Sequence, residues 1–403
     1  MKALLISVGT GTRASKRAVE SLAEAIAKSI NHHNPDKVFF VVTKQSLETT
    51  VPKILPKIES RKYDIIQLVD PDNIQSIYET LKPKIREIKN EYQRLIIDYT
   101  SGTKAMTAAL AVLATIFEVD ELSYITGKRK AGIVQHGTEQ IVPIRPYFIS
   151  AEQKIKTAIE FFNRNQFSAT VTILKQIKKT IRDPEIIDQI EPLLQLAEAY
   201  EKWDKFHHEK AYKLIRKIKI PELAKNKQFL GQLASNIRRE GETEPYYIAD
   251  LINNAKRRSE EAKYDDAVAR LYRTIELIAQ YRLKKDYGIA DTSKVEIEKI
   301  PKELLRRWRI SKEEKTVRLA LERDYELLSA LGDPMGHKYQ KDKRLKNLLK
   351  KRNMSILAHG QTPVTRQVYI QLNKKVMEYA KEAVENIGQF LENSKFIKWR
   401  IVR

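Results

Sequence analysis

The sequence predicts a doubly wound α/β domain followed by a long all-helical region. Two observations carry this prediction. Short apolar runs alternate with helical patterns up to about residue 146, and beyond about residue 150 only helical periodicity remains. At 403 residues the chain is long enough for two or three domains, each with a core of its own.

Four apolar runs are expected to form the buried strands, because each is short and bounded by turn residues. These runs are Ala3–Val8, Lys37–Thr43, Asp64–Val69 and Leu95–Ile97. The helical patterns between them are residues 15–30, 73–91 and 103–117. This alternation indicates a parallel sheet with helices on both faces. Residues 122–146 are expected to close the sheet, with turns near Gly127 and Gly137.

The helical region is expected to divide into a linker region and a C-terminal domain. Residues 240–245 are polar and include Gly241 and Pro245, which is typical of a boundary. We therefore predict a domain at 1–148, a helical linker region at 149–243 and a domain at 244–403. Three amphipathic runs follow aromatic-rich segments, at residues 161–167, 200–206 and 258–264. They resemble tetratricopeptide-type hairpins, but their irregular spacing favours a plain helical bundle.

Composition limits the classes of partner. Lys and Arg total 74 against 52 Asp and Glu, a formal charge of +22, which favours nucleic acid or a membrane surface. The alternative is a well-solvated surface rich in Lys and Glu. Cysteine is absent, which excludes disulfides, thiol nucleophiles and thiolate metal sites. The longest apolar run, Ala105–Phe117, is too short to span a bilayer. Without a recognisable signal peptide, we expect a cytoplasmic chain with no membrane contact.

A glycine-rich loop follows the first predicted strand. Its residues Gly9, Thr10, Gly11 and Thr12 precede a helix, so that backbone N–H groups can face an anion. The loop lacks the third glycine of a dinucleotide fingerprint and the Gly-Lys-Ser/Thr of a P-loop. Neither NAD binding nor ATP hydrolysis is therefore expected.

A second loop strengthens the prediction of a nucleotide site. Thr100, Ser101, Gly102, Thr103 and Lys104 follow the fourth predicted strand and open the next helix. Parallel sheets bind ligands at the carboxyl ends of their strands, so both loops should meet at one edge. They would offer backbone donors, hydroxyls and an ammonium to phosphates or ribose. The structural alternative is a tight turn with threonine capping.

The end of the second predicted strand adds another wall to this edge. Thr43, Lys44 and Gln45 lie there, although their motif is less distinctive.

The segment Arg352–His359 predicts the catalytic chemistry. The two residues are seven positions apart, which places them on one face of a helix that we expect to end at His359, before Gly360. A histidine that moves a proton and an arginine that stabilises phosphate charge suit attack by a ribose 2′-hydroxyl. Asn353 would orient either group. No cluster of His and carboxylates has metal-ligand spacing, so no metal or other cofactor is expected. A surface Arg and a helix-capping His are the structural alternative.

These motifs resemble two domains of one family. Residues 7–12 and 98–106 are similar to the ligand motifs of CARF domains, the Rossmann-like sensors of type III CRISPR systems. Arg352, Asn353 and His359 resemble the R-x(4–6)-H motif of HEPN ribonucleases. The helix expected at Tyr264–Leu283, with Arg270, Tyr272, Arg273 and Glu276, resembles the first long HEPN helix, and a pair between Arg273 and Glu276 is its simplest feature. The middle helices match no motif.

The resemblance implies a CARF–HEPN ribonuclease of the Csm/Csx type. Such a chain would form a homodimer, bind cyclic tetra- or hexa-adenylate across two sensor domains, and cut single-stranded RNA at a composite site. Its products would carry 2′,3′-cyclic phosphates. The sensor would in some relatives also cut its own activator, for which Lys104 and the adjacent hydroxyls are the residues to consider.

Two alternatives stay open at this point. The chain could be a non-catalytic sensor or regulator that binds nucleic acid, although no helix-turn-helix element is recognisable. It could also be an HEPN protein whose helices only dimerise. Of the remaining histidines, His337 is expected to lie exposed in a loop, and the others have no partner at useful spacing.

Overall fold

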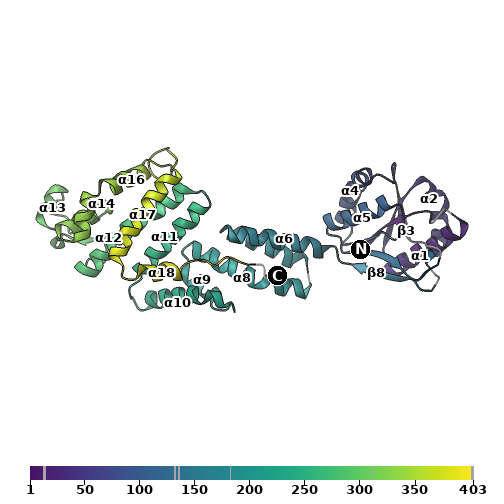
Figure 1. Cartoon of the computed structure of the whole chain (residues 1–403), viewed down its shortest axis with the longest axis horizontal. Helices are drawn as coiled ribbons and strands as arrows, with labels where there is room; N and C mark the ends of the chain where they lie inside the picture. The colour runs from purple at the N-terminus through teal and green to yellow at the C-terminus, as the bar shows by residue number, and fades with distance from the viewer. Residues whose placement is uncertain (12–14, 131–132, 135–136, 182, 312, 401–403) are drawn as a thin grey trace. The chain divides into compact units, whose positions relative to one another are not determined.

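The chain folds into two compact units, Met1–Lys156 and Thr157–Arg403 (Figure 1). The structure is a computed structural model that describes residues 1–11, 15–130, 133–134, 137–181, 183–311 and 313–400.

The first unit is built on a six-stranded sheet in the order β3-β2-β1-β4-β5-β8. All neighbouring strands are parallel except β5 and β8, which are antiparallel. The strands are β1 (Lys2–Val8), β2 (Lys37–Val42), β3 (Lys62–Gln67), β4 (Arg94–Asp98), β5 (Glu121–Thr126) and β8 (Gln140–Ile144). The predicted α/β class is confirmed, and the four apolar runs are the first four strands.

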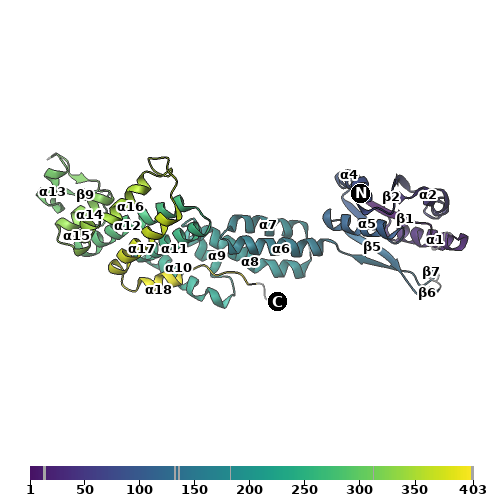
Figure 2. The same ribbon diagram turned by 45° about the horizontal axis from the view of Figure 1, so that its top comes forward.

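Helices cover both faces of this sheet. Successive side chains of β1 point to opposite sides, so each face has apolar side chains for a helix to cover. Leu4 and Ile6 belong to the core beneath α1 (Lys16–His33), and Ala3 and Leu5 to the core beneath α4 (Ile74–Glu91) and α5 (Lys104–Ile116). Short helical turns connect β2 to β3: α2 (Lys44–Thr49), α3 (Val51–Ile54) and the 3-10 turn Leu55–Lys57. The small ladder of β6 (Arg129–Lys130) and β7 (Ile133–Val134) lies beyond β5 (Figure 2).

The second unit is helical. Its helices, with α6 entering from the first unit, are α6 (Tyr147–Asn163), α7 (Phe167–Thr180), α8 (Pro184–Asp204), α9 (His208–Ile215), α10 (Ala224–Arg238), α11 (Glu244–Glu260), α12 (Tyr264–Tyr287), α13 (Lys302–Arg307), α14 (Leu321–Ala330), α15 (Pro334–Lys341), α16 (Lys343–Asn353), α17 (Arg366–Ala383) and α18 (Ile387–Asn393). Two 3-10 turns accompany them, Pro221–Leu223 and Ile297–Lys299.

One detail departs from the sequence prediction. A two-residue antiparallel ladder joins β9 (Val295–Glu296) to β10 (Thr316–Val317), although no strand was expected after residue 150. None of the described helices has both the length and the apolar character needed to cross a membrane.

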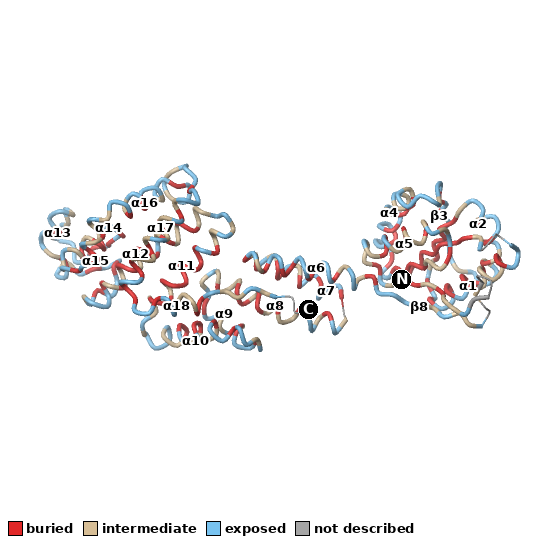
Figure 3. The backbone as a smooth tube through the Cα atoms, in the orientation of Figure 1, coloured by how far each residue is buried: buried red, intermediate tan, exposed pale blue. Residues whose placement is uncertain are grey.

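The long helix α12 organises the core of the C-terminal part. Its buried residues recur every three or four positions, as in Leu271, Ile275 and Ile278, so that one broad face is apolar. That face joins buried residues of α11, α14, α16 and α17 in a single cluster. Figure 3 shows buried residues following α11, α12 and α17.

Three helical hairpins share one tight turn. Asn165, Phe206 and Ala262 adopt left-handed backbone angles, with φ of 64°, 60° and 59°. In each turn the next N–H donates 2.9 Å back to a carbonyl five residues earlier: Gln166 to Phe161, His207 to Lys202 and Lys263 to Arg258. This is the Schellman arrangement that ends a helix. The three aromatic-rich segments of the sequence are therefore three turns of one design, at unequal spacing.

The C-terminal residues 394–400, which we call the C-terminal strap, run back along α8, α10 and the end of α6. Three side chains hold its backbone: Asn226 donates to the Lys395 carbonyl (2.8 Å), Ile397 N donates to the Tyr200 hydroxyl (3.0 Å), and Trp399 N donates to Asn163 Oδ1 (2.7 Å). Phe396 stacks on Tyr200 at 4.0 Å, and the Arg257 guanidinium lies 3.9 Å from the Phe396 ring centre. The strap thus ties the end of the C-terminal helices to the middle helices.

Candidate functional site

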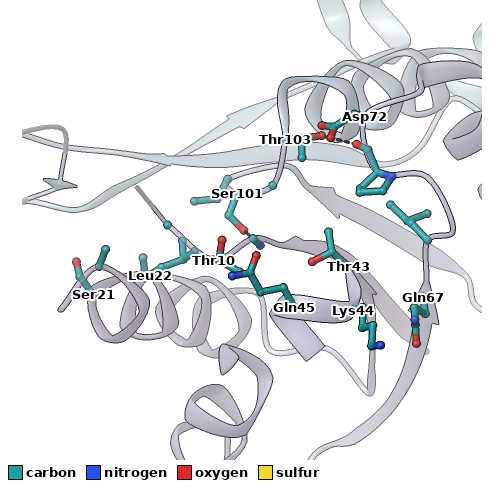
Figure 4. A pocket seen from close by; sticks show the side chains of 18 of the residues that line it. Thr10, Ser21, Leu22, Thr43, Lys44, Gln45, Gln67, Asp72, Ser101 and Thr103 are labelled. Carbon is teal, nitrogen blue, oxygen red and sulfur yellow. Dashed lines mark hydrogen bonds between the residues drawn. The ribbon is translucent and has the colours of Figure 1, made fainter. Parts of the chain in front are cut away.

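A large pocket opens at the carboxyl ends of the parallel strands in the first unit (Figure 4). Its volume of about 1140 Å³ is large for a small-molecule site. Of the residues predicted to bind the ligand, those on its wall are Gly9, Thr10, Gly11, Thr43, Lys44, Thr100, Ser101, Gly102 and Thr103, together with Gln45. Lys104 is the exposed first residue of α5 and is not part of this wall. Thr12 lies outside the described residues.

Hydrogen bonds join the two predicted loops at the edge of the sheet. The hydroxyls of Ser7 and Ser101 each donate to the other residue's carbonyl, and Gly9 N donates to Ser101 Oγ at 3.1 Å. A Cβ at Gly9 would lie 2.7 Å from Gly102 N, closer than such contacts occur. Glycine is required there because the two backbones touch.

The hydroxyls of these loops form hydrogen bonds within the protein. Thr100 Oγ1 accepts from Ile125 N at 2.9 Å, and Ser101 is held as described above. Thr103 donates to the Pro71 carbonyl and caps α5 by accepting from Met106 N at 3.2 Å. Thr43 caps α2 by accepting from Ser46 N at 3.0 Å. These hydrogen bonds give the hydroxyls a role in holding the loops in place.

Other polar groups are available to a ligand. Within the described residues, no hydrogen bond or ion pair engages the side chains of Thr10, Lys44, Gln45, Gln67 and Asp72, all of which belong to the pocket wall. Figure 4 shows Thr10, Lys44, Gln45, Gln67 and Asp72 among the side chains that line the pocket. An ammonium, two amides, a hydroxyl and a carboxylate can together bind phosphates and hydrogen-bonding edges of a base.

Two parts of this wall were not predicted from the sequence. Gln67 and Asp72 come from the end of β3 and the loop behind it, and Ser21 and Leu22 come from α1. A signal for the first pair existed, because the predicted run Asp64–Val69 ends at the same sheet edge as the other strands. The α1 residues carry no such signal.

A buried polar network lies beneath the second loop. The Asp98 carboxylate is fully buried and accepts from Thr100 N (2.8 Å), Ser123 Oγ (3.2 Å) and Ser29 Oγ. Burial raises the pKa of Asp98, against these hydrogen bonds. Ser123 also contacts His33 Nε2 at 3.0 Å, and burial, aided by nearby positive charge, lowers the pKa of His33 to about 4. The network fixes the start of the ligand loop with an uncharged imidazole at its base.

The second candidate site is at the end of α16, and here the expected geometry is wrong. The helix ends at Asn353 and not at His359, so Arg352 and His359 do not share a helix face. Residues 354–360 form turns after the helix. The helix stops because its chain folds back: Ser355 N donates to the Arg352 carbonyl at 2.9 Å, and Gly360 N donates to the Ser355 carbonyl at 3.2 Å.

The folded-back loop nevertheless returns His359 to the helix end. His359 N donates to the Asn353 carbonyl at 3.1 Å. Gly360 makes this possible, since a Cβ there would lie 1.9 Å from the Met354 carbonyl oxygen. The His359 side chain is exposed, as are Met354, Ile356 and Leu357 around it. The three candidate catalytic residues thus lie in one short segment, through a turn rather than through helical periodicity.

Arg352 is held in place by aromatic and amide contacts. Its guanidinium carbon lies 4.2 Å from the ring centre of Tyr272 on α12, and Nη1 donates to Asn353 Oδ1 at 3.1 Å. Its buried Nε has no hydrogen-bond partner within the described residues. Burial and the charge of Glu276 raise the pKa of Tyr272, so the ring stays neutral beneath the cation. Tyr272 thus gives Arg352 a support that leaves its outer N–H groups available to a phosphate.

The remaining predictions for the surrounding helices are mixed. Arg273 donates to Glu276 Oε2 at 3.0 Å within α12, as expected of a simple intrahelical pair. His337 is exposed as expected, but it lies within α15 and not in a loop, where Nδ1 contacts the Ser329 hydroxyl at 3.0 Å. The described residues contain no group of three or more His, Asp and Glu side chains that could hold a metal ion.

Three family models match consecutive parts of the chain. Residues 24–153 match the Card1 CARF domain, residues 150–242 the Csm6 6H domain, and residues 236–383 the Csm6 HEPN domain. The middle helices, which matched no motif by inspection, thus have a counterpart of their own. No curated protein matches the chain significantly.

A solved structure has the same fold over nearly the whole length. The chain is similar to Enterococcus italicus Csm6 bound to cyclic hexa-2′-fluoro-hexa-dAMP, with a TM-score of 0.65 and 14% identity over 98% of this chain and 99% of that chain. The family matches and this fold define the class, a CARF sensor domain joined to an HEPN domain. Within that class, the chain belongs to the CARF–HEPN effectors of type III CRISPR systems and has the domain order of Csm6.

Proposed function

We propose that the chain is an endoribonuclease of type III CRISPR antiviral defence that cuts single-stranded RNA without a metal ion when a cyclic oligoadenylate occupies its CARF domain. The observation that carries the proposal is the presence in one chain of a nucleotide-sized pocket and of the Arg352-Asn353-His359 segment. The similar Csm6 structure holds a cyclic hexanucleotide, which supports a ring of adenylates as the ligand here.

The pocket suits one part of such a ring. Backbone groups of Gly9, Gly11 and Gly102 would approach the phosphates closely, since these three residues carry no side chain. Lys44 would supply positive charge, and Gln45 and Gln67 would hydrogen-bond base edges. In this proposal the ring is a cyclic tetra- or hexa-adenylate, and the two chains of a homodimer share it. Cleavage of the ring by the sensor stays a separate prediction, because the hydroxyls considered for it already have partners in the protein.

The chemistry follows from the groups in the second site. A ribose 2′-oxygen attacks the adjacent phosphorus, a histidine removes the 2′ proton, the bond to the 5′-oxygen breaks, and that oxygen gains a proton. The products are a 2′,3′-cyclic phosphate and a 5′-hydroxyl. Arg352 stabilises the charge that develops on the phosphate oxygens. Asn353 orients Arg352 through its 3.1 Å hydrogen bond. These steps assign both proton transfer and charge stabilisation to side chains.

A homodimer completes this site in the proposal. One chain supplies a single His359, whereas the reaction needs a base and an acid, so two copies of the segment would share the work. Met354, Ile356 and Leu357 lie close to His359 in the sequence, and their side chains are 55%, 64% and 50% exposed. Apolar exposure of this kind is typical of a protein interface.

The chemistry can be tested through the substrate and the side chains together. A single-stranded RNA with one 2′-deoxy nucleotide should resist cleavage 3′ of that nucleotide only, and the other products should carry cyclic phosphates by mass spectrometry. Arg352→Ala and His359→Ala should each lower the rate by about 100-fold or more, with the cyclic-oligoadenylate affinity unchanged. Cleavage at the deoxy position, or full activity of His359→Ala, would refute the proposal.

A further inference from the structure

The surface leading to the candidate catalytic segment has an unusual charge. Between Lys343 and Met377 there are nine Lys and Arg residues and no Asp or Glu. The whole chain has 52 Asp and Glu in 403 residues, and none of them lies in this stretch of 35 residues. The first part of this stretch is α16, which ends in Arg352 and Asn353.

The cations of α16 gather on its outer side. At about 100° per residue, Lys343, Arg344, Lys350 and Lys351 fall within an arc of about 120°. The opposite side consists of Leu345, Leu348 and Leu349, which are buried. Figures 1 and 2 show α16 beside α17 on the outside of the helical unit. We call Lys343, Arg344, Lys350 and Lys351 the basic face of α16; all four are exposed.

The basic face has no counter-charges. Two nearby lysines outside it are paired: Lys338 with Glu382, and Lys375 with Asp342 at 3.1 Å and Glu378 at 3.0 Å. No ion pair within the described residues engages any member of the basic face. Asp342, the nearest acid, is occupied by Lys375 and by capping Leu345 N at 2.9 Å. Four like charges that repel each other are kept unpaired beside the candidate catalytic segment.

We propose that the basic face of α16 is the track along which single-stranded RNA reaches the cleavage site. From Lys343 to Lys351 the helix rises about 12 Å, at about 1.5 Å per residue. A stacked strand carries a phosphate about every 3.4 Å, so the face spans three to four phosphates. The track contacts phosphates and so leaves the sequence of the RNA unread. This proposal rests on the proposed function and deepens it, because it gives the position of the substrate on one side of the cut.

The test measures how RNA binding depends on salt. The probe is a fluorescent single-stranded 2′-O-methyl RNA, which lacks the attacking hydroxyl, and binding is followed by anisotropy with cyclic hexa-adenylate present. The test variant replaces Lys343, Arg344, Lys350 and Lys351 with Gln. Its matched control replaces four exposed cations of the same unit without ion pairs in the described residues, namely Lys210, Lys213, Arg216 and Lys217.

We expect the test variant to bind the probe about tenfold more weakly or worse at low salt. The slope of log affinity against log salt should flatten by about 2 to 3, at about 0.7 per lost phosphate contact. The control should keep the wild-type slope. Three results would overturn the proposal. The test variant and wild type could have equal slopes, the two variants could lose equal affinity for the probe, or the wild type could fail to bind it. If the quadruple variant does not fold, Lys350→Gln with Lys351→Gln should flatten the slope by about 1.4.

This experiment separates the two proposals. The probe cannot be cut, so the track can be confirmed even if native RNA is never cleaved and the proposed function fails. Conversely, cleavage of native RNA by the wild type with no change of slope in the variant would leave the nuclease in place and remove the track.

Discussion

Asp324 on α14 should make the stability of the second unit depend on pH. Its side chain is fully buried, and within the described residues neither carboxylate oxygen has a hydrogen-bond partner. Burial and the charge of Glu276 raise the pKa of Asp324 from 3.8 to about 8, against a smaller effect of Arg273. The folded protein therefore keeps this carboxyl protonated at neutral pH.

The sign and size of the effect follow from proton binding. The unfolded chain loses the Asp324 proton near pH 4, whereas the folded chain keeps it up to about pH 8. Between these values the folded state binds more protons, so its stability falls as pH rises. At pH 7 the Asp324 carboxyl lowers the free energy of unfolding by about 4 kcal/mol relative to a group that cannot ionise. This value is an upper limit and follows from about 1.36 kcal/mol per pKa unit.

The assay is thermal unfolding of Asp324→Asn against wild type from pH 4.5 to 8. All three tryptophans, Trp203, Trp308 and Trp399, belong to the second unit, so their fluorescence reports on that unit alone. The variant should melt about 10 °C above wild type at pH 7 and close to it at pH 4.5. Asp342→Asn is the control, and it should melt below wild type at pH 7. Burial would raise the pKa of Asp342, but hydrogen bonds from Leu345 N and Lys375 outweigh it, so the pKa is lowered and the charged form stabilises the fold. A pH-independent difference for Asp324→Asn would refute the reasoning.

Three further predictions concern the two sites and the strap. Gly9→Ala should weaken binding of cyclic hexa-adenylate by about tenfold or more in calorimetry, because the new Cβ forces the two loops apart; unchanged affinity would show that the loops do not hold the ring. Tyr272→Ala should lower kcat for RNA cleavage about 3- to 30-fold, the equivalent of the lost contact with Arg352, while Tyr272→Phe keeps the ring and the rate; equal loss in both would contradict a positioning role. Phe396→Ala should destabilise the second unit by about 2 kcal/mol in tryptophan-monitored denaturation, because its stacking on Tyr200 is lost; an unchanged midpoint would show that the strap adds no stability.

The sequence predicts the first site well because that site depends on strand ends. Gly9 and Gly102 lie at the ends of two apolar runs, and parallel strands bring such ends to one edge. What the sequence does not show is which groups face the ligand. The hydroxyls of Ser101 and Thr103 donate to the carbonyls of Ser7 and Pro71 in other loops. These partners are far away in the sequence, so only the folded structure shows them.

The second site shows the limit of periodicity. Arg352 and His359 have helical spacing, yet the chain leaves the helix after Asn353. The signal for this turn is Gly360, which fits against the Met354 carbonyl where a side chain would not. Long-range partners are equally invisible in the sequence: His208, for which no partner was predicted, lies 2.7 Å from the buried Asp250.

The most direct test of the central claim is cleavage of a labelled single-stranded RNA in EDTA, with and without cyclic tetra- and hexa-adenylate. The account predicts cleavage that appears only with one of the two rings and is lost in His359→Ala. A ring that binds the chain in calorimetry without producing cleavage would contradict the account and leave a sensor that does not cut RNA.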